Sequence, residues 1–202
     1  MSGPSGLVKP AQRRGRDGLS TICIEPAQAW NAGEGRVYVK RQQAYWCRPP
    51  WRLYRRTPML RRELRGLEAC RRHGIGVPRV VTYRERGSLS ELVLEEVQSA
   101  TPFDEALAAA PERDLVVREV AAAIGRLHGG GWTHGALYPA HILVGAPPDH
   151  AVTLIDLEKA RHNPLRRHAD LARFWRYCPP LTGIERALFE RHYRRARRHR
   201  PE

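Results

Sequence analysis

The chain has 202 residues, the length of one compact domain or of one domain in two lobes, and 42% of them are hydrophobic, enough for a core. Its formal net charge is +14, and all but three of its 35 basic residues (Lys9, Lys40 and Lys159) are Arg, so either it binds an anionic partner or its solvated surface is simply rich in Arg. The cysteines form no C-x-x-C pair, and the sequence has no leader-like apolar run and no stretch long enough to span a bilayer, which favours a cytoplasmic protein with reduced thiols.

Strands are expected in the first half of the chain. Residues 1–19, rich in Gly, Ser, Pro and Arg, are expected to be a mobile basic tail ahead of a single domain over residues 20–202. Alternating β-branched and aromatic residues predict strands at 21–26, 79–85 and 90–97. Within residues 31–42, a turn with Gly33 and Gly35 is expected to precede a strand that ends near Lys40. After this strand, an irregular basic aromatic loop precedes Thr57, which is expected to cap a helix that has Pro58 at its first position.

Helices are expected mainly in the second half. Apolar spacing predicts them at 102–109, 111–128, 167–177 and 183–198, with short strands at 141–144 and 151–156. Strands that come first and helices that come later indicate an α+β fold with segregated lobes.

The strand that ends near Lys40 predicts a nucleotide site. A kinase uses such a strand Lys to hold the α- and β-phosphates of ATP, and a helix Glu to fix its ammonium group. Glu63, 23 residues later, is the candidate partner, because Glu68 points to a different face of the same helix. The turn before the strand, with Gly33 and Gly35, could bring backbone N–H groups to phosphate, although it matches G-x-G-x-x-G poorly.

The segment THGALYPAHILV (residues 133–144) is similar to a kinase catalytic loop, H-R-D-L-x-x-x-N. His134 takes the first position, Ala136 replaces the catalytic Asp, and His141 replaces the metal-binding Asn. Asp156 in LIDLEKAR follows His134 by 22 residues, which suits a metal-binding Asp.

Two further segments complete this order. Glu95, Glu96 and Val97 stand where a hinge binds adenine through main-chain groups, and Asp170 stands where kinase-like folds keep a buried Asp that pins the catalytic loop. Taken alone, a strand Lys or a helix Glu is usually a solvated charge, and the His and Asp residues could be ordinary polar or turn residues. Their shared order and spacing favour a protein-kinase-like fold.

The segments VYVKRQ, LHGGGWTHGALYPAHILV and LIDLEKAR resemble the bacterial lipopolysaccharide kinase family, the Kdo and heptose (WaaP-like) kinases, and in particular its InaA-like branch. The likeness covers roughly residues 28–178. It implies a protein-kinase-like two-lobed α+β fold with a reduced C-terminal lobe. The N-lobe is then expected at about 20–97 and the C-lobe at about 98–202.

The resemblance also implies an activity. Active members transfer phosphate from ATP, with Mg²⁺ or Mn²⁺, to a sugar of the lipopolysaccharide inner core at the cytoplasmic face of the inner membrane. By this resemblance Lys40 and Glu63 hold ATP, Asp156 holds the metal, and His141 occupies the second metal position.

Three departures bear on catalysis. The side chain of Ala136 has no acceptor atom, His141 is a poor ligand for Mg²⁺, and Glu158 replaces the Gly of D-F-G. Positioning and electrostatics supply most of the acceleration of phosphoryl transfer, whereas a general base contributes about 10²–10⁴-fold. Weak activity, no activity, and activity through Asp156, Glu158 or His134 as the base therefore all stay open.

Two other classes of function compete with an active kinase. One is a pseudokinase, a kinase-shaped binding or regulatory module without phosphate transfer. The other is a nucleic-acid-binding protein, which the lack of a helix-turn-helix, zinc or RRM signature disfavours. The Arg-rich C-terminal helix also predicts peripheral, salt-sensitive contact with anionic membranes, with a solvated helix end as the alternative.

Overall fold

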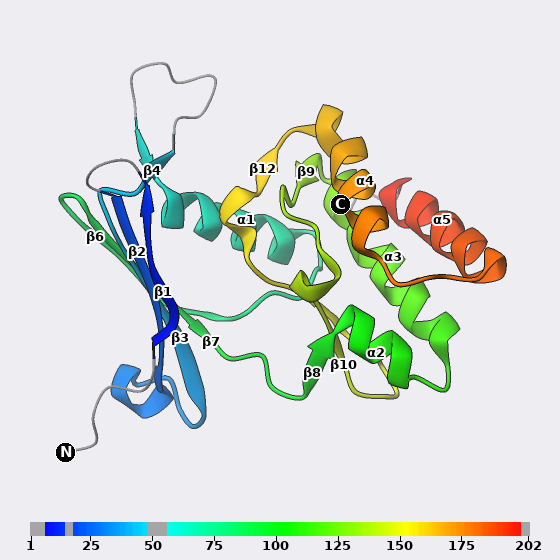
Figure 1. Ribbon diagram of the computed structural model, residues 1–202, viewed down its shortest axis with the longest axis horizontal. Coiled ribbons are helices and arrows are strands. Elements are labelled where there is room, and N and C mark those ends of the chain that lie inside the picture. Colours follow the sequence, from blue (N-terminus) through cyan, green and yellow to red (C-terminus); the bar gives the residue numbers. More distant parts are fainter. Residues whose placement is uncertain (1–6, 15–17, 48–55, 199–202) are drawn as a thin grey trace. The chain divides into compact units, whose positions relative to one another are not determined.

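The computed structural model describes residues 7–14, 18–47 and 56–198, and for 7–14 only the backbone (Figure 1). The chain divides into two compact units. The first comprises residues 1–64 and 78–96, and the second comprises 65–77 and 97–202. The division at 96/97 lies next to the expected lobe boundary, but residues 65–77 group with the second unit although they precede that boundary.

The first unit is built on a five-stranded antiparallel sheet in the order β1-β2-β3-β7-β6. The strands are β1 (Leu7–Arg14), β2 (Gly18–Pro26), β3 (Arg36–Gln43), β6 (Val80–Arg86) and β7 (Leu89–Glu95). Because β3 lies centrally, its alternate residues Val37 and Val39 are fully buried, whereas Lys40 projects from the other face. The α+β class expected from the sequence is confirmed.

Strand β1 lies within the segment expected to be a tail. It pairs antiparallel with β2 and forms an edge of the sheet. The strand contains Pro10 and a break in register, both of which a sheet tolerates at an edge. The composition of residues 1–19 predicted a mobile tail, whereas residues 7–14 of this segment form an edge strand.

The expected cap of the first long helix is different in the structure. Helix α1 spans Met59–Arg72, and the two residues before it form strand β5 (Thr57–Pro58), which pairs with β4 (Trp46–Cys47). The N–H of Met59 donates to the carbonyl of Tyr45 at 3.1 Å. The basic aromatic loop joining β4 and β5 lies, at residues 48–55, outside the described residues.

Over its described residues, the second unit contains four further helices and two short sheets. The helices are α2 (Phe103–Ala109), α3 (Arg113–Gly129), α4 (Arg167–Tyr177) and α5 (Gly183–Arg198), each at or within two residues of its expected bounds. Strand β10 (Ile142–Gly145) pairs with β11 (Val152–Leu154) and β8 (Ala100–Pro102), and β9 (Trp132–Thr133) pairs with β12 (Arg161–His162). Short 3-10 turns lie at Ala27–Trp30, Pro139–His141, Leu157–Lys159 and Pro164–Arg166.

Helices α3 and α5 lie side by side in this unit (Figure 1). Their backbones approach closely at two glycines of α3: a Cβ atom on Gly125 would lie 2.6 Å from the carbonyl of Tyr193, and one on Gly129 would lie 2.6 Å from that of Arg197. Phe189 of α5 also stacks on Phe174 of α4, with ring centroids 5.2 Å apart. Helix α5 is thereby held against both α3 and α4.

Within the described part of the chain, no helix is long and apolar enough to cross a membrane. All four cysteines are free thiols. Burial raises the pKa of Cys70 and Cys178 to about 12, so both thiols stay protonated at neutral pH.

Candidate active site

The first unit holds a buried ion pair. Lys40 of β3 donates from Nζ to Oε1 of Glu63 on α1 at a distance of 2.5 Å. The Lys40 side chain is 13% exposed and that of Glu63 is 1% exposed. Glu68 is exposed, so the structure brings together the two residues that the spacing predicted.

A buried pair of this kind is weak evidence for stability. Removing two charges from water costs several kcal/mol for each ion, and their mutual attraction offsets this only with good geometry. Burial without a clear gain in stability is instead typical of a functional group. The ammonium group of Lys40 is held in one place, as binding a phosphate chain requires.

The glycine turn and the expected adenine segment lie at the same end of the sheet. Gly33 and Gly35 have φ angles of +82° and +96°, which L side chains rarely adopt, and lie between β2 and β3. The next residue, Arg36, accepts a hydrogen bond at its carbonyl from the N–H of Glu96 at 3.0 Å. If adenine binds at Glu95–Val97, this glycine turn is close to adenine.

The turn between β1 and β2, residues 15–17, lies outside the described residues. The N–H groups of Glu95 and Glu96 donate to the carbonyls of Arg79 and Arg36. The binding of adenine by main-chain groups of Glu95 to Val97 therefore stays a prediction for the other main-chain groups of this segment. The side chains of Glu95 and Glu96 also form ion pairs with the same two arginines.

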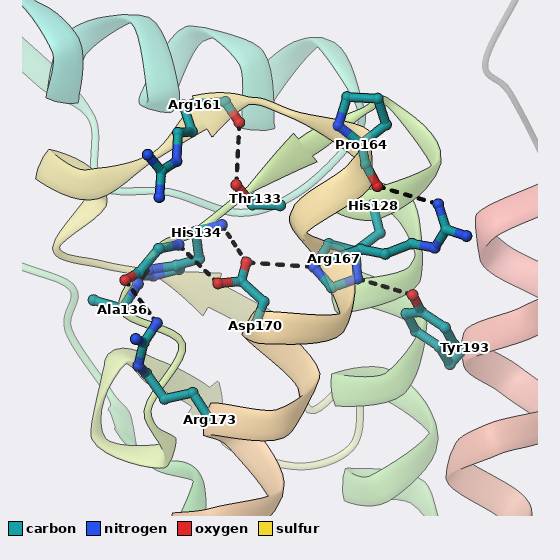
Figure 2. A network of polar contacts seen from close by, with 11 residues as sticks. His128, Thr133, His134, Ala136, Arg161, Pro164, Arg167, Asp170, Arg173 and Tyr193 are labelled. Carbon is teal, nitrogen blue, oxygen red and sulfur yellow. Dashed lines mark hydrogen bonds and ion pairs between the residues drawn. The ribbon is translucent and has the colours of Figure 1, made fainter. Parts of the chain in front are cut away.

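In the second unit, Asp170 of α4 holds the backbone of the loop that follows β9 (Figure 2). One carboxylate oxygen accepts from the N–H of His134 at 2.5 Å, and the other accepts from that of Gly135 at 2.9 Å. Burial opposes the ionisation of Asp170, but hydrogen bonds from His128 and from these backbone groups outweigh it and lower its pKa. The side chain is thus an ionised anchor for the loop.

Gly135 is required where this anchoring occurs. Its φ of +78° lies in the left-handed region, and a Cβ atom there would lie 2.5 Å from the carbonyl of Lys159. The loop can follow this path only with a glycine between His134 and Ala136.

Two residues that the sequence analysis did not single out extend the network. Nε2 of His128 on α3 lies 3.4 Å from Asp170, and Nδ1 of the same ring lies 2.9 Å from the hydroxyl of Tyr193 on α5 (Figure 2). Asp170 and Tyr193 follow His128 by 42 and 65 residues in the sequence, so no local motif predicts these contacts. Asp170 therefore links three helices to the loop.

The structure argues against His134 as a general base. The side chain is fully buried, Nε2 donates to the carbonyl of Ile155 at 3.0 Å, and Nδ1 accepts from the N–H of Ala136 at 3.3 Å. These partners fix the neutral Nε2–H tautomer and leave no lone pair for a substrate proton. Burial lowers the pKa of His134 to about 4, despite the opposing charge of Asp170. Its role is to support the loop.

Ala136, the residue that replaces the catalytic Asp, is buried in the structure. The residue is only 3% exposed, so its methyl group packs inside the protein. Its carbonyl accepts hydrogen bonds from the N–H of Tyr138 at 2.9 Å and from Nδ1 of His141 at 2.8 Å.

His141 of this loop lies next to Asp156, which follows β11, and solvent reaches both side chains. Because Nδ1 of His141 donates to a carbonyl, its Nε2 carries a lone pair, and this atom lies 3.5 Å from Oδ2 of Asp156. Both side chains are partly exposed. Asp156 has a φ of +58°, an uncommon backbone conformation for a residue other than glycine and one that recurs at functional sites.

The donor set of this pair can be compared with the two candidate metals. An imidazole nitrogen and a carboxylate suit Mn²⁺ better than Mg²⁺, which prefers oxygen ligands. Over the described residues no group of three or more His, Cys, Asp or Glu side chains could hold an ion by itself. A metal bound here would therefore need further ligands from water or a nucleotide phosphate, as is usual for Mg²⁺ in kinases.

A strand Lys paired with a buried helix Glu, and a loop of the H-x-x-L-x-x-x-H type anchored by an Asp, together define a kinase-like protein. A model of the Lipopolysaccharide kinase (Kdo/WaaP) family matches residues 14–194, and the chain belongs to this family. The match supports a kinase-like, lipopolysaccharide-modifying function with ATP as the phosphate donor. No curated protein sequence matches the chain, and the InaA-like branch stays a prediction.

Proposed function

We propose that the protein transfers phosphate from ATP to a sugar hydroxyl of the lipopolysaccharide inner core. The observation that carries this proposal is the Lys40–Glu63 pair, which fixes a positive charge on the central strand of the first unit. In the proposed mechanism Lys40 binds nucleotide phosphates and Glu63 orients its ammonium group. Gly33, Gly35 and Val97 contact the nucleotide from the adjoining turn and segment.

In the second unit, Asp156 is the proposed metal ligand and His141 its neighbour at the second metal position. A bound Mg²⁺ or Mn²⁺ would neutralise charge on the transferred phosphate. If no metal binds Nε2 of His141, this atom is also the proposed general base for the sugar hydroxyl. It lies beside Asp156, and the Nδ1 of the same ring is the nitrogen that binds the carbonyl of Ala136. We propose His141 rather than His134 as the base, because the side chain of His134 is fully buried and both of its ring nitrogens have partners in the protein.

The pseudokinase remains the second candidate, and Ala136 is the observation that favours it. An active kinase and a pseudokinase are distinguished by measuring transfer of ³²P from ATP to purified lipid A-core in a single turnover, for wild type and Asp156→Ala. An active kinase gives labelled lipid that the Asp156→Ala change reduces at least about 100-fold, by loss of the metal ligand. ATP binding without any labelled lipid in the wild type would establish the pseudokinase.

Restoring the missing Asp is expected to harm the protein. Because Ala136 is 3% exposed, Ala136→Asp would bury a carboxyl group and lower the free energy of unfolding by about 1–3 kcal/mol, without a gain in phosphate transfer. Urea unfolding and the single-turnover assay measure the two effects. Ala140→Asp is the matched control, since Ala140 is exposed on the same loop. A faster transfer in Ala136→Asp would show that the methyl group faces the reacting phosphate after all.

We also propose that the protein is cytoplasmic and attaches peripherally to the anionic inner face of the inner membrane through α5. The exposed side of this helix carries Arg191, Arg195 and Arg198, while Glu190 is paired with Arg194 at 2.8 Å. An anionic surface attracts each nearby Arg by about 1 kcal/mol, and salt screens this attraction.

Changing these three arginines to Gln is expected to weaken binding to anionic vesicles about 100-fold at low salt, from the same per-residue estimate. Co-sedimentation with vesicles measures the effect. The matched control changes Arg36, Arg41 and Arg61, which are exposed but paired with glutamates, and it should bind like the wild type. Equal loss in both triple variants would mean that only net charge matters.

A further inference from the structure

Arg173 of α4 places a positive charge directly beside the loop that contains Ala136. Its Nη1 donates to the carbonyl of Gly135 at 2.8 Å, and Figure 2 shows the side chain reaching from α4 to the backbone next to Ala136. Gly135 O is a neutral acceptor, and over the described residues Arg173 has no carboxylate within ion-pair distance. Within this part of the chain its charge therefore has no ion-pair partner.

Several other arginines that the fold orients are paired with carboxylates. Arg36, Arg41 and Arg61 each bind a glutamate, and the partly buried Arg113 binds Glu185 at 2.6 Å. Arg173 is also partly buried, and among the described residues one of its five N–H donors forms a hydrogen bond, to the carbonyl of Gly135. A guanidinium held in place by a backbone carbonyl can bind a carboxylate or phosphate through two of its other N–H groups.

A line of aromatic rings adjoins this cation. Tyr177, at the end of α4 and 55% exposed, packs edge-on against Tyr138 with ring centroids 5.2 Å apart. Tyr138 in turn packs against His141 at 5.4 Å, and the guanidinium of Arg173 lies 5.7 Å from the centre of the Tyr138 ring. The rings thus lead from the surface of the second unit to the His141–Asp156 pair.

This combination matches the chemistry of an acidic sugar. The C–H face of a pyranose ring is apolar and packs on an aromatic ring, while a carboxylate or phosphate on the sugar pairs with a guanidinium. We propose that Arg173, Tyr138 and Tyr177 form the acceptor subsite, in which Arg173 binds the anionic group of the sugar and the two tyrosines bind its ring. The inference deepens the proposed function and rests on it for the reaction, but binding can be tested without any transfer.

The competing explanation is that Arg173 only supports the loop through Gly135. A Gln at this position can still donate to that carbonyl but carries no charge, whereas a Lys keeps the charge and loses the planar fork. The two substitutions therefore separate the electrostatic role from the supporting role.

The experiment is an NMR titration of the full-length protein with free Kdo and with its methyl ester, in which a methyl group on the carboxyl removes the negative charge. We expect Kdo to bind the wild type about ten times more tightly than the ester. Arg173→Gln should weaken Kdo binding about tenfold and abolish the difference between Kdo and ester, and Arg173→Lys should keep part of that difference. Tyr177→Ala should weaken both ligands alike, because it removes only ring contact.

Arg176→Gln is the control, since Arg176 is exposed on the same helix, and it should bind both ligands like the wild type. Glucose 1-phosphate, titrated alongside, distinguishes a subsite for phosphate-bearing sugars from one for carboxylate sugars, and Arg173-dependent binding of either supports the proposal. If Arg173→Gln binds every anionic sugar as the wild type does, or loses stability with the Kdo–ester difference intact, the proposal is overturned.

The outcomes also separate this subsite from the proposed reaction. Arg173-dependent binding of Kdo in a protein that transfers no phosphate would keep the subsite and reject the kinase. Phosphate transfer with a KM for lipid A-core that is unchanged by Arg173→Gln would keep the kinase and reject the subsite.

Discussion

Replacing Lys40 by Met is expected to weaken binding of Mg-ATP by about 10–100-fold, the effect of losing one charge-assisted hydrogen bond to phosphate. The same change should lower the free energy of unfolding by about 3–5 kcal/mol, because Glu63, 1% exposed at its side chain, loses the ammonium group beside it. Calorimetric titration with Mg-ATP measures the first effect, and urea unfolding measures the second.

A double variant separates these two effects. Lys40→Met with Glu63→Gln removes both charges, so most of the lost stability should return while nucleotide affinity stays low. Arg41→Gln is the matched control, because it removes an exposed cation from the next position of β3 and should leave Mg-ATP binding unchanged. Wild-type affinity in the stable double variant would show that Lys40 is not a nucleotide ligand.

The sequence predicted the parts of the fold that depend on local spacing. Helices α4 and α5 lie at their expected bounds, because their apolar residues recur every three to four positions. The Lys40–Glu63 pair was also predictable, since a central strand and the first turns of the following helix leave few choices of partner. Local periodicity and element order therefore suffice for the framework of this family.

The parts that depend on distant residues were not predictable. The pairing of Thr57 with Cys47 requires two segments to meet across a loop, and nothing within either segment indicates it. The burial of His134 is set by Ile155 and Asp170, which follow it by 21 and 36 residues. A motif that matches a catalytic loop gives the register of its residues but does not say which of them face substrate.

The same distinction applies to Ala136. Its position in the motif indicated a catalytic loop that lacks its Asp, but both the N–H and the carbonyl of Ala136 form hydrogen bonds within the loop. His141 and Tyr138 donate to the carbonyl of Ala136, and its N–H donates to His134. The residue is thus part of the hydrogen-bonded frame that orients His141 toward Asp156. This frame is complete without a side chain at position 136.

Stability is expected to fall steeply as the pH drops from about 6.5 to 4, and His134 is the cause. Protonation would place a hydrogen on Nδ1, opposite the N–H of Ala136, in a fully buried site. Burial, the largest cause, lowers the pKa of His134 from 6.5 to about 4 in the folded protein. Between these values the unfolded chain binds a proton that the folded protein does not, so the free energy of unfolding decreases as pH falls.

The loss amounts to about 3 kcal/mol, at about 1.4 kcal/mol for each pH unit of the shift. Stability is fully present above pH 6.5, and the loss ends once pH falls below the folded value near 4. The measurement is urea unfolding at closely spaced pH values for wild type, His134→Gln and His168→Gln. His134→Gln should be less stable at pH 7 but show a flatter dependence, since Gln does not titrate. His168 is exposed, so His168→Gln should follow the wild-type curve. Parallel curves for wild type and His134→Gln would mean that His134 is protonated in the folded protein as readily as in the unfolded chain.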